Sequence, residues 1–142
     1  MIYQTDPEFP PDIQHFGCYF LSLLFQLDRV LSLGLMDHKI IQAIYEAESK
    51  DFDIGPECYM TNPKSLANHV ARGKVDFLGR FDRFYVCREN ELEVCRWFNP
   101  NTDFGHFVAG DGKGKVIYDP IRGGSRTVRE GYLESKRIFS VV

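Results

Sequence analysis

A cysteine stands where a helix is expected to begin, directly after a glycine. The segment Gln14-His15-Phe16-Gly17-Cys18 leads into a long apolar stretch. A cysteine in the first turn of a helix lies near the positive end of the helix dipole and near unpaired amides, and both favour its thiolate. Gln14, four residues upstream, can donate its side-chain amide to a developing oxyanion. The commoner role of a free cysteine, a small buried hydrophobic residue, fits this segment too.

A histidine and an aspartate flank a predicted β-hairpin far along the chain. The segments 106–111 and 115–119 enclose the turn Gly112-Lys113. If the turn centres there, His106 and Asp119 face each other across the ladder, with Cβ atoms about 4.5–5.5 Å apart. At that distance a carboxylate can orient an imidazole and stabilise its protonated form. A register slip of one residue would put the two on opposite faces, and a surface His–Asp pair without function is the alternative.

Together these residues give the order Cys…His…Asp, and in this the chain resembles the papain-like cysteine peptidase superfamily. The similarity is greatest to its bacteriocin-processing (C39-like) branch, in which a glutamine precedes a helix-opening cysteine, and a strand that begins His-Phe-Val leads to a strand that ends Asp-Pro. The matching residues here are Gln14, Cys18, His106-Phe107-Val108 and Asp119-Pro120. The segments 17–24 and 118–121 also resemble a family of phage and spirochaete-plasmid proteins.

The resemblance implies a papain-like α+β fold and a cysteine-dependent amide hydrolase. It assigns Cys18 as nucleophile, His106 as acid and base, Asp119 as the group that orients His106, and Gln14 as an oxyanion donor. The implied partner is a peptide or another amide substrate, such as peptidoglycan or a protein, and no cofactor is implied. Gln14 lies closer to Cys18 than the superfamily usually shows, and Gln4 is the substitute that the sequence offers.

The elements that must position these residues change character halfway along the chain. Apolar residues at helical spacing predict helices first, and alternating residues predict an antiparallel sheet afterwards, which is typical of an α+β domain. Residues 1–14 are expected to be an extended lead-in because of their prolines. The predicted helices are 17–33, 37–49 and 63–72, and the predicted strands are 84–88, 92–98, 106–111, 115–119 and 137–142.

Length and composition bound the function. The 142 residues predict a single domain, 1–142, and 44% hydrophobic with 14% aromatic residues predict a packed core. Seventeen basic against twenty acidic residues leave a net charge of −3, which does not favour a nucleic acid or an anionic membrane as partner. No apolar stretch approaches the roughly 20 residues of a membrane span, and no secretory signal is evident. The four cysteines predict a reducing, cytoplasmic setting.

Several other residues are candidates for simpler roles. His15, beside Cys18, can serve as a second base but is more simply a solvated neighbour. Asp111, the rival of Asp119, is expected on the other face of its strand. The segment 122–126 lacks the residues of a phosphate-binding loop and predicts a turn. No cluster with metal-ligand spacing is visible, so no metal is predicted.

Two further classes of function stay open on the sequence alone. One is a binding module that keeps the peptidase fold without turnover, which the short spacing between Gln14 and Cys18 supports. The other is a structural phage component that oligomerises through an exposed sheet edge. The sequence does not distinguish hydrolysis from deamidation or acyl transfer, because these reactions share a triad and differ in the acyl acceptor.

Overall fold

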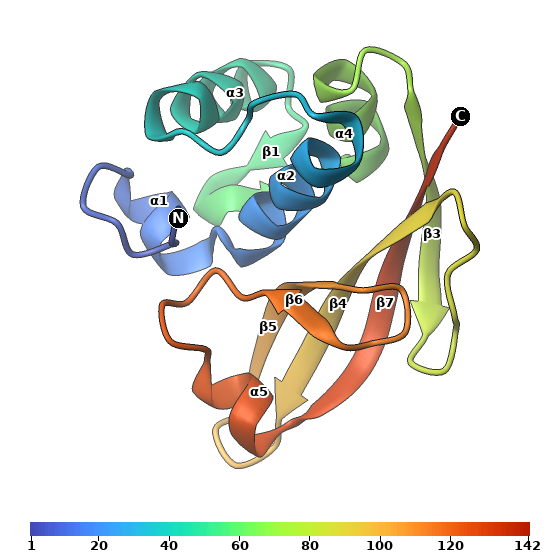
Figure 1. Ribbon diagram of the computed structural model, residues 1–142. Helices are drawn as coiled ribbons and strands as arrows, with labels where there is room; N and C mark the ends of the chain where they lie inside the picture. The colour runs from blue at the N-terminus through green and yellow to red at the C-terminus, as the bar shows by residue number, and fades with distance from the viewer.

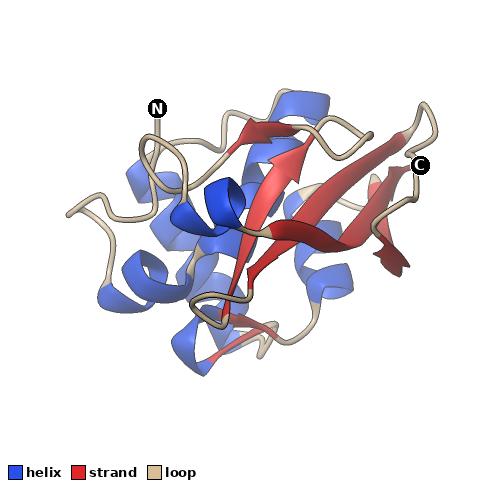
Figure 2. Ribbon diagram, turned by 90° about the horizontal axis from the view of Figure 1, so that it is seen from below, coloured by secondary structure: helices blue, strands red, loops and turns tan.

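The helices of the first half and the strands of the second half form two layers. The computed structural model describes residues 1–142. A five-stranded antiparallel sheet has the order β3-β7-β4-β5-β6, and most of the helices lie to one side of it (Figures 1 and 2). The elements are α1 (Pro11–Phe16), α2 (Cys18–Leu31), α3 (His38–Lys50), β1 (Ile54–Gly55), η1 (Pro56–Cys58), β2 (Tyr59–Met60), α4 (Pro63–Val70), β3 (Val75–Asp82), β4 (Glu91–Asn99), β5 (Phe104–Gly110), β6 (Val116–Tyr118), α5 (Arg126–Glu130) and β7 (Tyr132–Val141). The predicted α+β class is confirmed.

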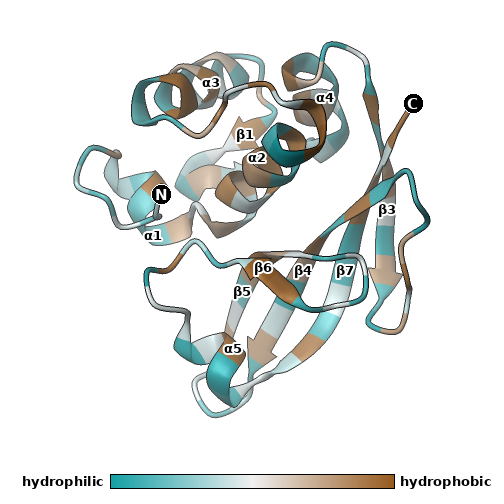
Figure 3. Cartoon of the chain, in the orientation of Figure 1, coloured by the Kyte–Doolittle hydropathy of each residue, from teal (hydrophilic) through white to brown (hydrophobic).

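Helix α2 is the central element of the core. It packs across β4 and β5 and is one of the more apolar elements of the chain (Figure 3). Its buried side chains contact apolar residues of the sheet such as Val94 and Phe139 within one hydrophobic cluster. The helix ends at Leu31, followed by Ser32 in the left-handed region (φ 53°). The predicted helix 17–33 is therefore confirmed, with its end two residues early.

Side-chain caps fix the starts of the next two long helices. The Asp37 carboxylate accepts hydrogen bonds from the amides of Lys39 and Ile40 at the start of α3. The side-chain oxygen of Asn62 accepts one from the amide of Ser65 at the start of α4. Such caps satisfy amides that have no partner inside the helix, typically at about 1 kcal/mol each. Both predicted helix starts are confirmed.

The predicted strand 84–88 is wrong. The chain instead forms β3 at 75–82 and then an irregular segment up to β4, and β3 pairs with β7 rather than with β4. Phe84 and Val86, whose alternation suggested a strand, are exposed. Gly79, at φ 120° where β3 shifts register, interrupts the apolar pattern that would otherwise have indicated β3.

The N-terminal residues 1–14, which were expected to be extended, also differ from that prediction. Residues 11–16 form α1 rather than extended chain, because Pro11 occupies the first helical position, where a missing amide hydrogen costs nothing. Two further elements were not predicted, the two-stranded sheet β1–β2 and the short helix α5. None of the helices combines the length and the apolar character needed to cross a membrane.

Candidate active site

Cys18 is the first residue of α2, and Gly17 makes the tight connection between α1 and α2. The Gly17 amide donates to the Ile13 carbonyl at 2.9 Å. A Cβ on residue 17 would lie 2.5 Å from that same carbonyl oxygen, so the two helices can meet this closely only at a glycine. Cys18 as a residue is partly exposed, and it lines a cleft. The structure thus places Cys18 at the helix start that the sequence predicts.

His106 and Asp119 are in direct contact. His106 Nε2 and Asp119 Oδ1 lie 2.7 Å apart. The carboxylate is held from its other side, because Oδ1 accepts from the amide of Ile121 at 2.9 Å and Oδ2 from the amide of Ser125 at 2.8 Å. The Asp119 side chain is therefore fixed before it meets the imidazole.

The contact does not arise from the predicted strand register. In the β5–β6 hairpin Ala109 pairs with Tyr118 and Gly110 with Val116, with a bulge between the two pairs. His106 therefore has no partner on β6, which ends at Tyr118, and Asp119 reaches the imidazole from just beyond the strand end. The predicted opposed pairing is wrong in its geometry, although the two side chains do meet.

The same imidazole and the Cys18 thiol line one cleft and lie close enough to change each other's pKa. Burial alone would raise the pKa of the Cys18 thiol, but the hydrogen bond and charge of His106 outweigh it and lower that pKa. Hydrogen bonds from the amides of Phe107 and Tyr19 act in the same direction. Burial lowers the pKa of His106, yet the partners Asp119 and Cys18 raise it to about 9. Despite burial, His106 holds the pKa of Asp119 below its usual value.

These directions favour the charged form of all three groups. Because Asp119 engages Nε2, the other ring nitrogen of His106 is the one available to Cys18. The arrangement can hold a thiolate next to an imidazolium, which is the resting form of an activated cysteine nucleophile.

Gln14 and Gln4 both line the cleft at this site. The Gln14 side-chain nitrogen donates to the Phe9 carbonyl at 2.7 Å. Gln4 is buried, and its side-chain nitrogen donates to the backbone carbonyl of Gln14 at 3.0 Å, while its side-chain oxygen has no partner. The structure brings both amides near Cys18 and engages one hydrogen of each with a backbone carbonyl. The oxyanion role of Gln14 stays a prediction.

A cleft of about 680 Å³ opens over Cys18 and His106. Exposed His15 borders it, as does Ser125 at the start of α5. Asp111, by contrast, lies in the β5–β6 turn, where its carboxylate accepts from the amides of Lys113 and Lys115. Asp111 is thus a turn residue, and the 122–126 segment is a turn that leads into α5.

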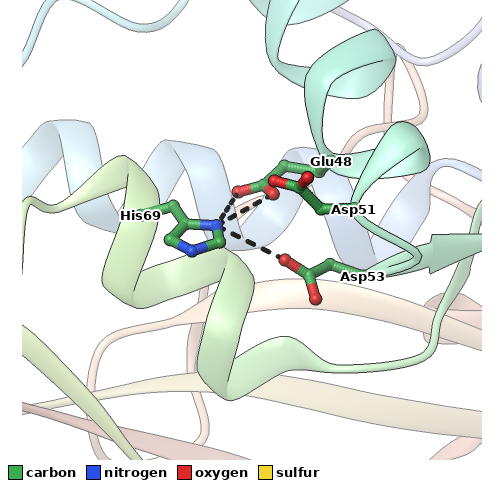
Figure 4. A group of neighbouring side chains, drawn as sticks. All are labelled: Glu48, Asp51, Asp53 and His69. Carbon is green, nitrogen blue, oxygen red and sulfur yellow. Dashed lines mark hydrogen bonds and ion pairs between the residues drawn. The ribbon is translucent and has the colours of Figure 1, made fainter.

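A second group of titratable side chains lies away from the cleft, between α3 and α4. His69 Nδ1 is 3.1 Å from Glu48 Oε2 and 3.4 Å from Asp53 Oδ2, with Asp51 beside them (Figure 4). The ligand atoms of the four lie within 4.8 Å of one another, so these are the residues that could together hold a metal ion. Sequence reasoning missed this group because its members come from two helices and the segment between them. Hydrogen bonding to Glu48 raises the pKa of His69.

Sequence reasoning also missed Arg137 and Tyr19 as residues of the cleft. Arg137 lies on β7, the last strand in the sequence. Only the order of the strands in the sheet brings it near the start of α2. Tyr19 directly follows Cys18 and has apolar neighbours in the sequence. The adjacency of Tyr19 to Cys18 was a usable signal, whereas nothing in the sequence indicates Arg137.

Comparison with known proteins gives one match. Neither a curated protein nor a solved structure matches the chain. The family model described as "Protein of unknown function, DUF261" matches residues 1–141, and the chain therefore belongs to that family.

Proposed function

We propose that this protein is a cysteine-dependent amide hydrolase, a peptidase or amidase, with Cys18, His106 and Asp119 as its catalytic triad. One observation carries the proposal. The imidazole of His106 lies 2.7 Å from Asp119, and the Cys18 thiol, at the start of α2, lines the same cleft close enough to interact with that imidazole. Nucleophile, base and orienting group are thus neighbours in the order that acyl-transfer chemistry needs.

The reaction follows from this arrangement. The Cys18 thiolate attacks the carbonyl carbon of the amide, forming a C–S bond and a tetrahedral oxyanion. The oxyanion collapses as the C–N bond breaks, and the imidazolium of His106 gives its proton to the departing amine. Water, deprotonated by His106, then attacks the thioester. The C–S bond breaks, the acid leaves, and Cys18 returns to thiolate beside a protonated His106.

Asp119 keeps His106 in the correct orientation and stabilises its charge. The oxyanion is stabilised by the amide of Cys18, since the first amides of a helix have no intrahelical acceptor. Gln14 or Gln4, both at the cleft, contributes a side-chain donor. One such donor is typically worth about 3 kcal/mol of transition-state stabilisation.

We further propose that the fold is a small papain-like one, related to the C39-like branch. In support, the nucleophile opens the central helix α2, and α2 packs on β5, the strand that carries His106. All four cysteines are free, in keeping with action in a reducing compartment such as the cytoplasm. The substrates that fit are a peptide, a protein or peptidoglycan, and no cofactor or nucleic acid takes part in the proposed reaction.

One observation favours a second candidate, a binding module without turnover. The side-chain amide of Gln14 points to the Phe9 carbonyl rather than being free for a substrate. In that case peptides would bind in the cleft and leave unchanged.

An activated ester distinguishes the two candidates. Incubation with p-nitrophenyl acetate is expected to acylate Cys18 in a rapid burst, detected by intact mass and peptide mapping. Cys18→Ala should abolish the burst. Cys58→Ala is the matched control, because Cys58 borders the same cleft but burial raises the pKa of its thiol to about 12. A burst that persists in Cys18→Ala would overturn the proposed hydrolase.

A further inference from the structure

Arginines outnumber carboxylates among the residues that line the cleft over Cys18, although the whole chain is acidic. Three arginines border it, Arg96, Arg126 and Arg137, against a single carboxylate, Glu57. The chain as a whole has a net charge of −3. Since a cleft with low-dielectric walls strengthens the field of its charges, an arginine without a paired carboxylate there attracts an anionic group into the site.

Arg137 is the arginine of this set that lacks a carboxylate of its own. The carboxylate that acts on it, Glu134, is ion-paired with Arg80 and Arg96. Three guanidinium groups thus share one carboxylate. The hydrogen bond that Arg137 makes to a side chain goes to the Ser135 hydroxyl at 2.9 Å. A guanidinium has five N–H donors, so most of those of Arg137 remain for a ligand.

Arg137 is nevertheless half-buried. Burial lowers the pKa of its guanidinium, and the neighbouring arginines Arg80 and Arg96 act in the same direction. A cation removed from water without a counter-ion is costly, and an incoming anion offsets that cost.

A stack of aromatic rings connects Arg137 to the catalytic pair. The Arg137 guanidinium carbon lies 5.3 Å from the centre of the Phe107 ring, and that ring stacks on Tyr19 at 4.5 Å. Phe107 directly follows His106, and Tyr19 directly follows Cys18. The Arg137 guanidinium is therefore connected, through the rings of Phe107 and Tyr19, to the residues that directly follow the two reacting groups.

The hydroxyl of Tyr19 is a second group at the cleft that lacks a partner, independently of Arg137. Its oxygen is buried and has no hydrogen-bond partner in the chain, although the residue borders the cleft. Burial raises the pKa of Tyr19, so the group remains an O–H donor. The Tyr19 hydroxyl and most of the N–H donors of Arg137 thus lack an acceptor in the protein, and a buried donor left unpaired is unfavourable.

We infer that Arg137 and Tyr19 form a subsite for a carboxylate, so that the substrate is an amide with an acidic side chain close to the bond that is cleaved. A carboxylate accepts from the guanidinium through two oxygens and can take the phenolic hydrogen as well. This inference rests on the proposed function, because it names the substrate class of that same site.

A matched pair of alkylating probes tests it. N-iodoacetyl-glutamic acid α-amide and N-iodoacetyl-glutamine amide differ only in a carboxylate against a carboxamide. Their rates of reaction at Cys18, followed by peptide mass mapping, should favour the acidic probe by about tenfold, the factor that 1.4 kcal/mol gives. Arg137→Gln should bring the ratio close to one, and Tyr19→Phe, which removes only the hydroxyl, should lower it severalfold.

Arg126→Gln is the control, since it removes the same charge from the cleft but its guanidinium is ion-paired with Glu130. An equal loss of preference in Arg126→Gln would mean a diffuse field and would overturn the subsite, as would a ratio unchanged in both Arg137→Gln and Tyr19→Phe. If Arg137→Gln does not fold, Tyr19→Phe decides alone. Failure of the proposed function looks different, because the wild-type thiol would then react with the neutral probe only as an ordinary cysteine does.

Discussion

Asp119 meets His106 at 2.7 Å although the two residues are not cross-strand neighbours. The amides of Ile121 and Ser125 aim the carboxylate at the imidazole from beyond the end of β6. The position of the carboxylate thus depends on a turn after the strand rather than on the ladder. A substitution at Asp119 should therefore disturb the orientation of the His106 ring.

Replacing Asp119 by asparagine tests that dependence. In Asp119→Asn the shape is kept but the charge that raises the pKa of His106 is lost, so this pKa should fall from about 9 towards its ordinary value. NMR titration of the His106 ring measures the change, and acylation of Cys18 should slow by about a hundredfold as the imidazole loses its fixed orientation. Asp111→Asn, a turn residue, should change neither quantity.

The pH profile of turnover should be bell-shaped. The rising limb follows ionisation of Cys18, whose pKa is lowered by His106, and therefore lies below the range of an ordinary thiol. The falling limb comes as His106 loses the proton that it gives to the leaving amine, near pH 9. Hydrolysis of an amide or anilide substrate across pH 4–11 measures both limbs. A rate that only rises through pH 9 and beyond would contradict the role of His106 as acid.

The His69 group predicts a pH-dependent link between α3 and α4. Because hydrogen bonding to Glu48 raises the pKa of His69 in the folded protein, its stabilising effect is complete below the unfolded value of about 6.5 and is lost as pH rises through the folded value. His69→Gln should therefore lower the melting temperature at pH 6 and have less effect at pH 9. His15→Gln, an exposed histidine outside this group, is the control, and equal effects of both substitutions at each pH would refute the link.

A buried ion pair holds the hairpin that leads to Asp119. Lys136 Nζ lies 2.8 Å from Glu93 Oε1, and both side chains are almost fully buried. The other oxygen of Glu93 accepts from the amides of Gly112 and Gly114 in the β5–β6 turn. Lys136→Met leaves the Glu93 charge unpaired and should lower the free energy of unfolding by about 3–5 kcal/mol.

Urea unfolding measures this loss. The double variant Lys136→Met/Glu93→Leu removes both charges and should recover part of the lost stability, because no single buried charge then remains. If the single variant unfolds at the wild-type midpoint, the pair has no structural role.

Gly17 should tolerate no side chain. In Gly17→Ala the added methyl meets the Ile13 carbonyl, so α1 must move away from α2. The expected result is a loss of Cys18 reactivity out of proportion to any loss of helix content, measured by iodoacetamide labelling beside circular dichroism. Wild-type labelling in a folded Gly17→Ala protein would show that the tight connection does not position the thiol.

Local signals explain which elements could be predicted from the sequence. The starts of α3 and α4 follow from Asp37 and Asn62, whose caps act within three residues, and α2 follows from its dense apolar spacing. The strand at 84–88 failed because its alternation lies on an exposed segment, and β3 was missed because Gly79 breaks its pattern. Periodicity reports a strand only where one face is buried continuously.

In the candidate site, too, only the residues with a local sequence signal could be predicted. Cys18, His106 and Asp119 could be proposed from local context, although the hairpin register expected for the last two was wrong because a bulge follows Ala109. Arg137 could not be proposed, because β7 reaches the cleft only through non-local strand pairing. The Glu48–His69 group escaped for a related reason, since its members are brought together by helix packing.

The pH dependence of Cys18 alkylation by iodoacetamide tests the central claim most directly. The other three cysteines are replaced, folding is checked, and wild-type His106 is compared with His106→Ala. We expect an alkylation midpoint well below the ordinary thiol value of about 8.5, and a return towards that value in His106→Ala. A midpoint near 8.5 that does not respond to His106 would contradict the thiolate–imidazolium pair and, with it, the proposed hydrolase.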